Sequence, residues 1–184
     1  MNLAKIKRAA HCLQDGGIIA YPTEAVWGLG CDPWNEIAVM RLLGVKQRAV
    51  DKGLILVAAT LEQIAPVYHC LDQDQQATLK KSWPGPYTWL VPDIENRIPY
   101  WIKGDHSSVA IRISAHPLVR ELCLAFGAPV VSTSANITGR PALRSRVKVM
   151  TALHNKVDMV LPGSLGDSAQ PSSIRDLSSG KTIR

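Results

Sequence analysis

The feature that most constrains the fold is a set of short, continuously apolar segments separated by segments with helical spacing. A strand that is apolar at every position, instead of every second one, is typical of a sheet covered on both faces. We therefore predict an α/β or α+β fold with a twisted mixed sheet flanked by helices. The predicted strands cover residues 18–21, 54–59, 87–91, 109–113, 129–131, 157–161 and 174–176, the last pairing with 181–184.

Helical spacing of apolar residues predicts the elements between these strands. The first helix covers residues 3–13 and ends at Asp15-Gly16-Gly17, where glycine can adopt a positive φ. Asn35 can cap a second helix that runs to about Gly44. Further helices are expected within 61–82 (one or two), 117–126 and 147–155.

Size and composition indicate one globular domain over residues 1–184, because no repeat, low-complexity tract or linker divides the chain. Hydrophobic residues make up 46% and charged residues 20% of the sequence, which excludes an intrinsically disordered protein. No apolar stretch approaches the roughly 20 residues needed to cross a bilayer, and no secretory signal is expected. These features predict a cytoplasmic protein without a membrane span.

The cysteines and the net charge limit the kinds of ligand that the protein is expected to bind. The four cysteines are scattered and lack the spacing of a zinc site, so we expect reduced thiols and no metal site built by the protein. The net charge of +6 at pH 7 favours polyanionic partners, either nucleotide phosphates or RNA. Charge by itself does not choose between them.

Basic residues cluster at Lys46-Gln47-Arg48 and at Lys52, between a predicted helix and a predicted strand. If this connection is extended, Lys46 and Arg48 point to the same side, because alternate side chains share a face. Two converging cations suit a nucleotide triphosphate, since Arg forks onto phosphate oxygens and Lys supplies a compact charge. A solvated basic loop is the alternative.

A second cluster consists of small polar residues. Residues 132–136 read Ser-Thr-Ser-Ala-Asn and directly follow the predicted strand at 129–131. Hydroxyl, amide and backbone N–H donors at a strand end can approach a bound oxyanion closely. The alternative is an ordinary turn whose side chains satisfy their own backbone.

Thr23 and Arg112 are further candidates for a binding site. Thr23 follows the first strand and precedes Gly28-Leu29-Gly30, which we predict as a turn, so its hydroxyl binds either a small substrate or the turn itself. Arg112 lies inside an apolar strand, where a buried guanidinium must find an anion or several carbonyls. That anion is either a ligand carboxylate or an internal acid such as Asp32.

Neither common nucleotide-binding fingerprint occurs, because there is no G-x-x-x-x-G-K-[ST] loop and no G-x-G-x-x-G after a strand. Eight short motifs nevertheless follow one another in a specific order over nearly the whole chain. They are Tyr-Pro-Thr-Glu at 21–24, Lys-x-Arg at 46–48, Lys-Gly-Leu at 52–54, Trp-Pro-Gly-Pro at 83–86, Ala-Ile-Arg at 110–112, His-Pro at 116–117, Ser-Ala-Asn at 134–136 and Pro-Ser-Ser-Ile at 171–174. In this order and content the chain resembles the YrdC-like family, whose short bacterial members are threonylcarbamoyl-AMP synthases.

The resemblance implies a YrdC-like fold with a central basic cavity. It also implies a reaction in which L-threonine, bicarbonate and ATP give threonylcarbamoyl-AMP and pyrophosphate. ATP would be a substrate, with Mg²⁺ bound through its phosphates. The product would pass to a tRNA threonylcarbamoyl transferase complex for the t6A modification of the adenosine beside the anticodon, and direct RNA binding is left open.

The match to the family's motifs also implies roles for individual residues. The residues of the threonine pocket would be Thr23, Arg112, Ser134 and Ser172. The residues on the ATP side would be Lys46, Arg48, Lys52, Ser108, Asn136, Arg144 and Arg184.

No side chain stands out as a covalent nucleophile, so catalysis should depend on positioning and charge. We expect Lys46 and Arg48 to act as catalytic residues by stabilising the charge that develops as a carbamate oxygen attacks the α-phosphate. These cations and the 132–136 turn would then face each other across one hollow.

Two other classes of protein fit the same features. A double-stranded RNA or ribosome-assembly binding protein would bind RNA with a steep salt dependence and would release no pyrophosphate with threonine. A carbamoyl-transfer domain for another acceptor is the third possibility. It is weakened because no zinc-finger or acylphosphatase-like segment accompanies the domain.

Overall fold

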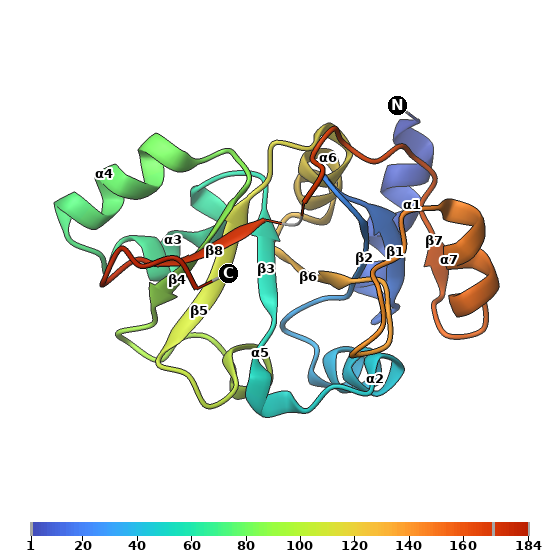
Figure 1. Ribbon diagram of the computed structural model, residues 1–184, viewed down its shortest axis with the longest axis horizontal. Coiled ribbons are helices and arrows are strands. Elements are labelled where there is room, and N and C mark those ends of the chain that lie inside the picture. Colours follow the sequence, from blue (N-terminus) through green and yellow to red (C-terminus); the bar gives the residue numbers. More distant parts are fainter. Residues whose placement is uncertain (1, 171, 184) are drawn as a thin grey trace.

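The computed structural model describes residues 2–170 and 172–183. Its centre is a mixed eight-stranded sheet with the strand order β7-β1-β2-β6-β3-β5-β4-β8 (Figure 1). The strands are β1 Ile19–Pro22, β2 Trp27–Gly30, β3 Ile55–Ala58, β4 Tyr87–Pro92, β5 Ser108–Ile113, β6 Val130–Ser134, β7 Met159–Val160 and β8 Ser173–Asp176. Parallel pairs (β1 with β7, β3 with β5, β4 with β8) occur beside antiparallel ones, so the predicted mixed α/β fold is confirmed.

The helices alternate with the strands along the chain. They are α1 Leu3–Gln14, α2 Glu36–Lys46, α3 Ala65–Tyr68, α4 Gln73–Ser82, α5 Tyr100–Lys103, α6 Pro117–Phe126 and α7 Arg146–Leu153, with short 3₁₀ turns at Val50–Lys52 and Glu62–Ile64. Asn35 caps α2 as predicted, because its side chain accepts a hydrogen bond from the Ala38 N–H. The helix runs past Gly44 to Lys46 and ends where Gln47 adopts left-handed backbone angles (φ 50°, ψ 50°).

Apolar residues cover both faces of the sheet. Successive residues of a strand face opposite sides, and here they belong to two different core clusters. On β3, Val57 packs with α1 and α6, whereas its neighbour Leu56 packs in the larger cluster that includes α2 and α4. The continuous apolar pattern of this strand therefore reflects burial on both sides, as the sequence predicted.

The segment Gly28-Leu29-Gly30 is part of strand β2, so its prediction as a turn was wrong. β2 pairs antiparallel with β1, placing Leu29 opposite Ala20. The glycines provide space for close packing instead of turn geometry. A Cβ atom on Gly30 would lie 2.5 Å from the Val131 carbonyl oxygen and 2.8 Å from a ring carbon of Tyr21.

Smaller differences concern the short elements. The 61–82 segment contains one 3₁₀ turn and two helices, and α5 was not predicted. The predicted strand at 157–161 is reduced to Met159–Val160. The predicted C-terminal pairing is present as one antiparallel bridge between Arg175 and Thr182, while Arg184 lies outside the described residues.

Two predictions about the whole chain can be compared with the described part of it. None of the helices at 2–170 and 172–183 is long and apolar enough to cross a membrane. The four cysteines are free thiols, of which Cys31 and Cys123 are buried and Cys12 and Cys70 half-buried.

Candidate functional site

A cavity of about 580 Å³ lies over one face of the sheet. On β6, Val130 packs with α1 and α6, while Ser132 and Ser134, two and four residues further along the same face, line the cavity. On β5, Ala110 and Arg112 line it in the same way. The cavity therefore begins where the two helices stop covering this face of the sheet.

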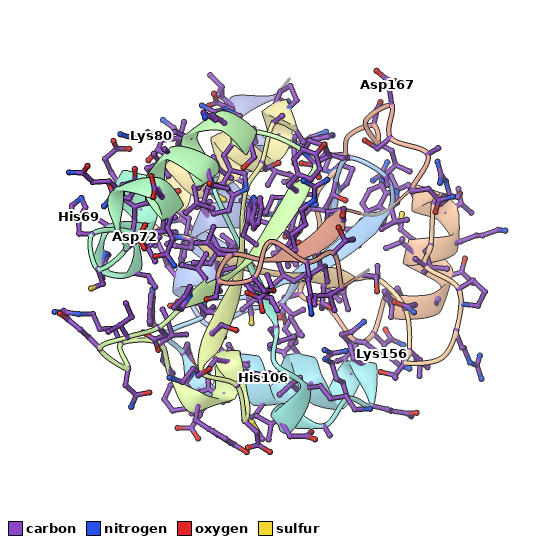
Figure 2. All side chains as sticks on the ribbon, turned by 60° about the vertical axis from the view of Figure 1, so that its left-hand side comes forward. His69, Asp72, Lys80, His106, Lys156 and Asp167 are labelled. Atoms are coloured by element: carbon purple, nitrogen blue, oxygen red, sulfur yellow. The ribbon has the colours of Figure 1, made fainter. Side chains whose placement is uncertain are left out.

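Charged groups from distant parts of the sequence line this cavity. Among the described residues of its wall, one is an acid, Glu24, and five are Lys or Arg: Arg48, Lys52, Lys103, Arg112 and Arg140. His106 also lines the cavity, on the loop between α5 and β5, and is labelled in the lower part of Figure 2. Such a wall provides donors for an anionic ligand.

Lys46 lies outside this wall, although it was predicted to point the same way as Arg48. The connection between them is not extended, because Lys46 is still helical and Gln47 is left-handed. The Lys46 side chain is buried, with 2% of the residue exposed. Its Nζ donates to the carbonyl oxygens of Ser134 (2.6 Å) and Asn136 (2.9 Å), so it holds the 134–136 turn from behind.

Burial also changes the protonation of Lys46. Burial, helped by the nearby positive charge of Arg48, lowers the pKa of Lys46 to about 8. The two carbonyl acceptors oppose this shift because they favour the charged ammonium group. The turn is thus held by an amine that titrates near physiological pH.

Arg48 lines the cavity and is fixed by its own loop. Its Nη2 donates to the carbonyl oxygens of Gly53 (2.8 Å) and Lys52 (3.1 Å). Gly53 has a φ of 60°, and a Cβ there would lie 2.9 Å from the Lys103 carbonyl oxygen, so the loop requires glycine at this position. The Arg48 guanidinium therefore faces the cavity from a defined position.

Several of the hydroxyl groups at the cavity have protein partners. Thr23 donates to the Val26 carbonyl oxygen at 2.7 Å. Thr88 and Ser172 share a hydrogen bond of 2.8 Å, and the Ser134 hydroxyl donates to the Asn136 side-chain oxygen at 2.5 Å. Each hydroxyl oxygen keeps further capacity for a ligand, because a hydroxyl has two acceptor lone pairs.

Arg112 is paired with an internal acid, which was one of the two alternatives left open by the sequence. That acid is Glu24, not Asp32: the Arg112 Nη2 atom lies 3.2 Å from Glu24 Oε2. Only 9% of the Arg112 side chain and 14% of the Glu24 side chain are exposed. Arg112 Nε is buried without a hydrogen-bond partner among the described residues.

The structure brings most of the predicted site residues together. The cavity is lined by Thr23, Arg48, Lys52, Ser108, Arg112, Ser134, Asn136 and Ser172. Arg144 is outside the wall and donates to the Ala169 carbonyl oxygen at 2.9 Å. Arg184 lies outside the described residues.

Sequence reasoning missed several residues of the cavity wall. Glu24 was quoted within a motif but was given no role. Lys103 and Arg140 follow no recognisable pattern, and Lys103 is held by Asp93, whose Oδ2 lies 2.8 Å from its Nζ. Burial alone would raise the pKa of Asp93, but hydrogen bonds from Lys103 and from two backbone N–H groups lower it. Only the packing of the loops reveals this ion pair.

The fold is that of a mixed α/β protein, and the described wall of its cavity carries more basic than acidic side chains. The Sua5/YciO/YrdC family model, described as "Telomere recombination", matches residues 11–184. The chain therefore belongs to the Sua5/YciO/YrdC family.

Individual relatives agree with this assignment. The threonylcarbamoyl-AMP synthase of Pseudomonas entomophila (strain L48) is 52% identical over 180 residues, which cover 98% of this chain and 96% of the relative. That of Pseudomonas aeruginosa (strain UCBPP-PA14) is 54% identical over 176 residues, covering 96% and 94%.

A solved structure, P. abyssi Sua5 complexed with L-threonine, superimposes with a TM-score of 0.90 at 30% identity. The match covers 99% of this chain and 53% of that one, so this chain spans about half the length of the solved protein.

Proposed function

We propose that this chain is a threonylcarbamoyl-AMP synthase, forming threonylcarbamoyl-AMP and pyrophosphate from L-threonine, bicarbonate and ATP. The names of relatives about 50% identical over almost their whole length support this activity. One structural observation connects this activity to particular residues. Cations near residue 50 and the Ser-Ala-Asn turn near residue 135 line the same cavity, although they are far apart in sequence.

The threonine would bind on the floor of the cavity. Arg112 offers a buried guanidinium to the α-carboxylate, and such charge-assisted bonds are stronger than neutral ones. The hydroxyls of Thr23, Ser134 and Ser172 would contact the small polar substrate. In support, P. abyssi Sua5, which is 30% identical, was crystallised with L-threonine.

The ATP would occupy the side of the cavity formed by Arg48, Lys52, Ser108 and Asn136. Arg48 and Lys52 supply the positive charge for the phosphates, as expected for phosphate sites. Arg144 and Arg184 remain part of this proposal because the match to the family's motifs implies that they belong to the ATP side.

The reaction can proceed by positioning and electrostatics. The neutral threonine amine and bicarbonate form a carbamate with loss of water, a carbamate oxygen attacks the α-phosphorus of ATP, and pyrophosphate leaves. Arg48 would stabilise the charge that develops on the phosphates. Lys46, predicted as a second catalytic residue, would instead position the 134–136 turn, because its Nζ bonds to that backbone and the side chain is buried.

Mg²⁺ would reach the site on the phosphates of ATP. Among residues 2–170 and 172–183, no group of three His, Cys, Asp or Glu side chains is arranged to hold a metal ion. The one carboxylate at the cavity wall in this part of the chain, Glu24, is already paired with Arg112. When bound, Mg²⁺ would neutralise phosphate charge.

The proposal is tested by measuring pyrophosphate release with L-threonine, bicarbonate and ATP present, and with each omitted in turn. We expect release to require all three. Arg48→Ala should lower the rate at least about tenfold, because a charged hydrogen bond contributes roughly 1.5 to 3 kcal/mol. Release that does not depend on threonine would exclude this activity.

The same protein preparation can be used to test the alternative function, a protein that binds RNA without catalysis. A protein that only binds RNA would show salt-dependent RNA binding and no pyrophosphate release. Transfer of the product to a tRNA threonylcarbamoyl transferase complex, and a cytoplasmic location, belong to the proposed function as predictions.

A further inference from the structure

The positive charge of this protein is concentrated in one segment of the chain. Residues 137–157 contain five of the 21 Lys and Arg residues and none of the 15 Asp and Glu residues, so they account for most of the net charge of +6. These cations are Arg140, Arg144, Arg146, Lys148 and Lys156. The ion pairs found among residues 2–170 and 172–183 all involve other cations, so the charge of this segment is available to an anionic partner.

The basic segment begins at the cavity and is held in place there. The Thr138 N–H donates to the Lys46 carbonyl oxygen at 3.0 Å, and the Trp27 N–H donates to the Leu143 carbonyl oxygen at 2.8 Å. Between these two bonds lies Arg140, which lines the cavity and is also exposed to solvent. A partner bound to this segment would therefore lie beside the edge of the cavity.

The outer face of α7 adds apolar groups to this charge. Val149 and Leu153 are buried under the helix, whereas Val147 is 72% exposed and Met150 is 45% exposed. Nucleic acid backbones bind the cations of a surface and gain little from apolar side chains, whereas protein interfaces bury apolar side chains within a polar rim. Apolar and basic groups on one helix therefore favour a protein partner over RNA.

We call the exposed residues Arg146, Val147, Lys148 and Met150 the α7 surface. A partner that complements it carries Asp or Glu opposite the two cations and apolar side chains opposite Val147 and Met150. A solvated face would need no apolar side chain as exposed as Val147.

The chemistry of the proposed product identifies the kind of partner. Threonylcarbamoyl-AMP is a mixed anhydride of a carbamic acid and a phosphate, so water competes with the enzyme that consumes it. We propose that the α7 surface docks an acidic, partly apolar surface of that enzyme, which receives the product beside the cavity. This inference rests on the proposed function, since it assigns a docking surface to the transfer of the same product.

The experiment measures the dissociation constant between this chain and a purified tRNA threonylcarbamoyl transferase complex by biolayer interferometry. The variant Arg146→Glu with Lys148→Glu reverses two charges of the α7 surface. Its matched control is Lys80→Glu with Lys81→Glu, which makes the same change in net charge on α4, where both lysines are exposed. Figure 2 shows Lys80 on the opposite side of the molecule from Lys156, which follows α7. We expect the α7 variant to bind at least about tenfold more weakly than wild type and the control to bind as wild type does.

A neutral substitution separates protein docking from RNA binding. Val147→Ser removes an apolar contact without changing charge, so it should weaken binding to the complex about three- to tenfold. Binding to a tRNA transcript, measured in the same buffer, should not change. Leu124→Ser is the matched control, because this leucine is 49% exposed on α6. Pyrophosphate release by the chain alone should stay at the wild-type rate in every variant, since no substituted residue is among the described residues that line the cavity.

Each outcome has a separate meaning. If the wild type does not bind the complex, or if either α7 variant binds it as tightly as its control, the inference is overturned while the proposed function stands. If the charge reversal weakens only tRNA binding, the α7 surface is an RNA site and the inference is also overturned. If the wild type releases no pyrophosphate that depends on threonine, the proposed function itself fails.

Discussion

Replacing Lys46 by Met tests whether this lysine acts through the backbone it holds. The Nζ atom donates to two carbonyl oxygens, at 2.6 Å from Ser134 and 2.9 Å from Asn136, and 2% of the residue is exposed. Met fills similar volume without a donor, so the Asn136 carbonyl oxygen loses this partner, while the Ser134 carbonyl oxygen keeps the hydrogen bond from the Asn136 N–H at 2.9 Å. Each lost hydrogen bond to the charged amine costs about 1.5 to 3 kcal/mol, and the nearby cavity admits water, so we expect a loss of about 2 to 4 kcal/mol.

The loss is measured by thermal unfolding together with pyrophosphate release. For a domain of this size, 1 kcal/mol corresponds to about 2 to 4 °C, so the melting temperature should fall by roughly 4 to 16 °C. Turnover should fall at least about tenfold, because Ser134 and Asn136 belong to the proposed substrate site. Lys80→Met is the matched control, since Lys80 is exposed on α4 (Figure 2).

A lysine that contacts only the ligand would behave differently. In that case Lys46→Met would unfold at the same temperature as Lys80→Met and would lose activity alone. Such a result would refute the view that Lys46 holds the turn, and the original prediction of a direct catalytic contact would regain support.

Three further predictions follow from single contacts. Gly30→Ala should lower the free energy of unfolding, measured by chemical denaturation, by about 1 to 3 kcal/mol, because the new Cβ would lie 2.5 Å from a carbonyl oxygen. Gly44→Ala should instead raise it by about 0.5 to 1 kcal/mol, because Gly44 is in a helix and a Cβ there would meet no atom within 4 Å. The affinity for ATP, measured by calorimetry, should decline as the pH rises through about 8, where Lys46 loses its proton, and this decline should be absent in Lys46→Met. Arg175→Ala should lower the free energy of unfolding by about 1 kcal/mol, because its guanidinium lies 4.2 Å from the Tyr87 ring; an unchanged value would exclude a stabilising contact.

Local patterns in the sequence predicted most elements, because amphipathic helices have a clear apolar period and strands buried on both faces are continuously apolar. The cap at Asn35, the stop after α1 and the helix at 117–126 depend on neighbouring residues, and all agree with the structure. β2 was missed because Gly28 and Gly30 have two physical uses. A turn uses the backbone freedom of glycine, whereas close packing of strands uses its lack of a side chain. Only the position of the neighbouring strand distinguishes these two uses.

The sequence by itself determined most of the element types, the order of the motifs and hence the family, since these depend on residues near one another along the chain. It also supplied eight of the residues that line the cavity. The tertiary structure decided where the cavity lies, because α1 and α6 cover only one end of a sheet face whose strands come from distant segments. It also decided that Lys46 is buried behind a turn and that Arg112 pairs with Glu24. Both contacts join residues about 90 positions apart, a separation over which no local period carries information.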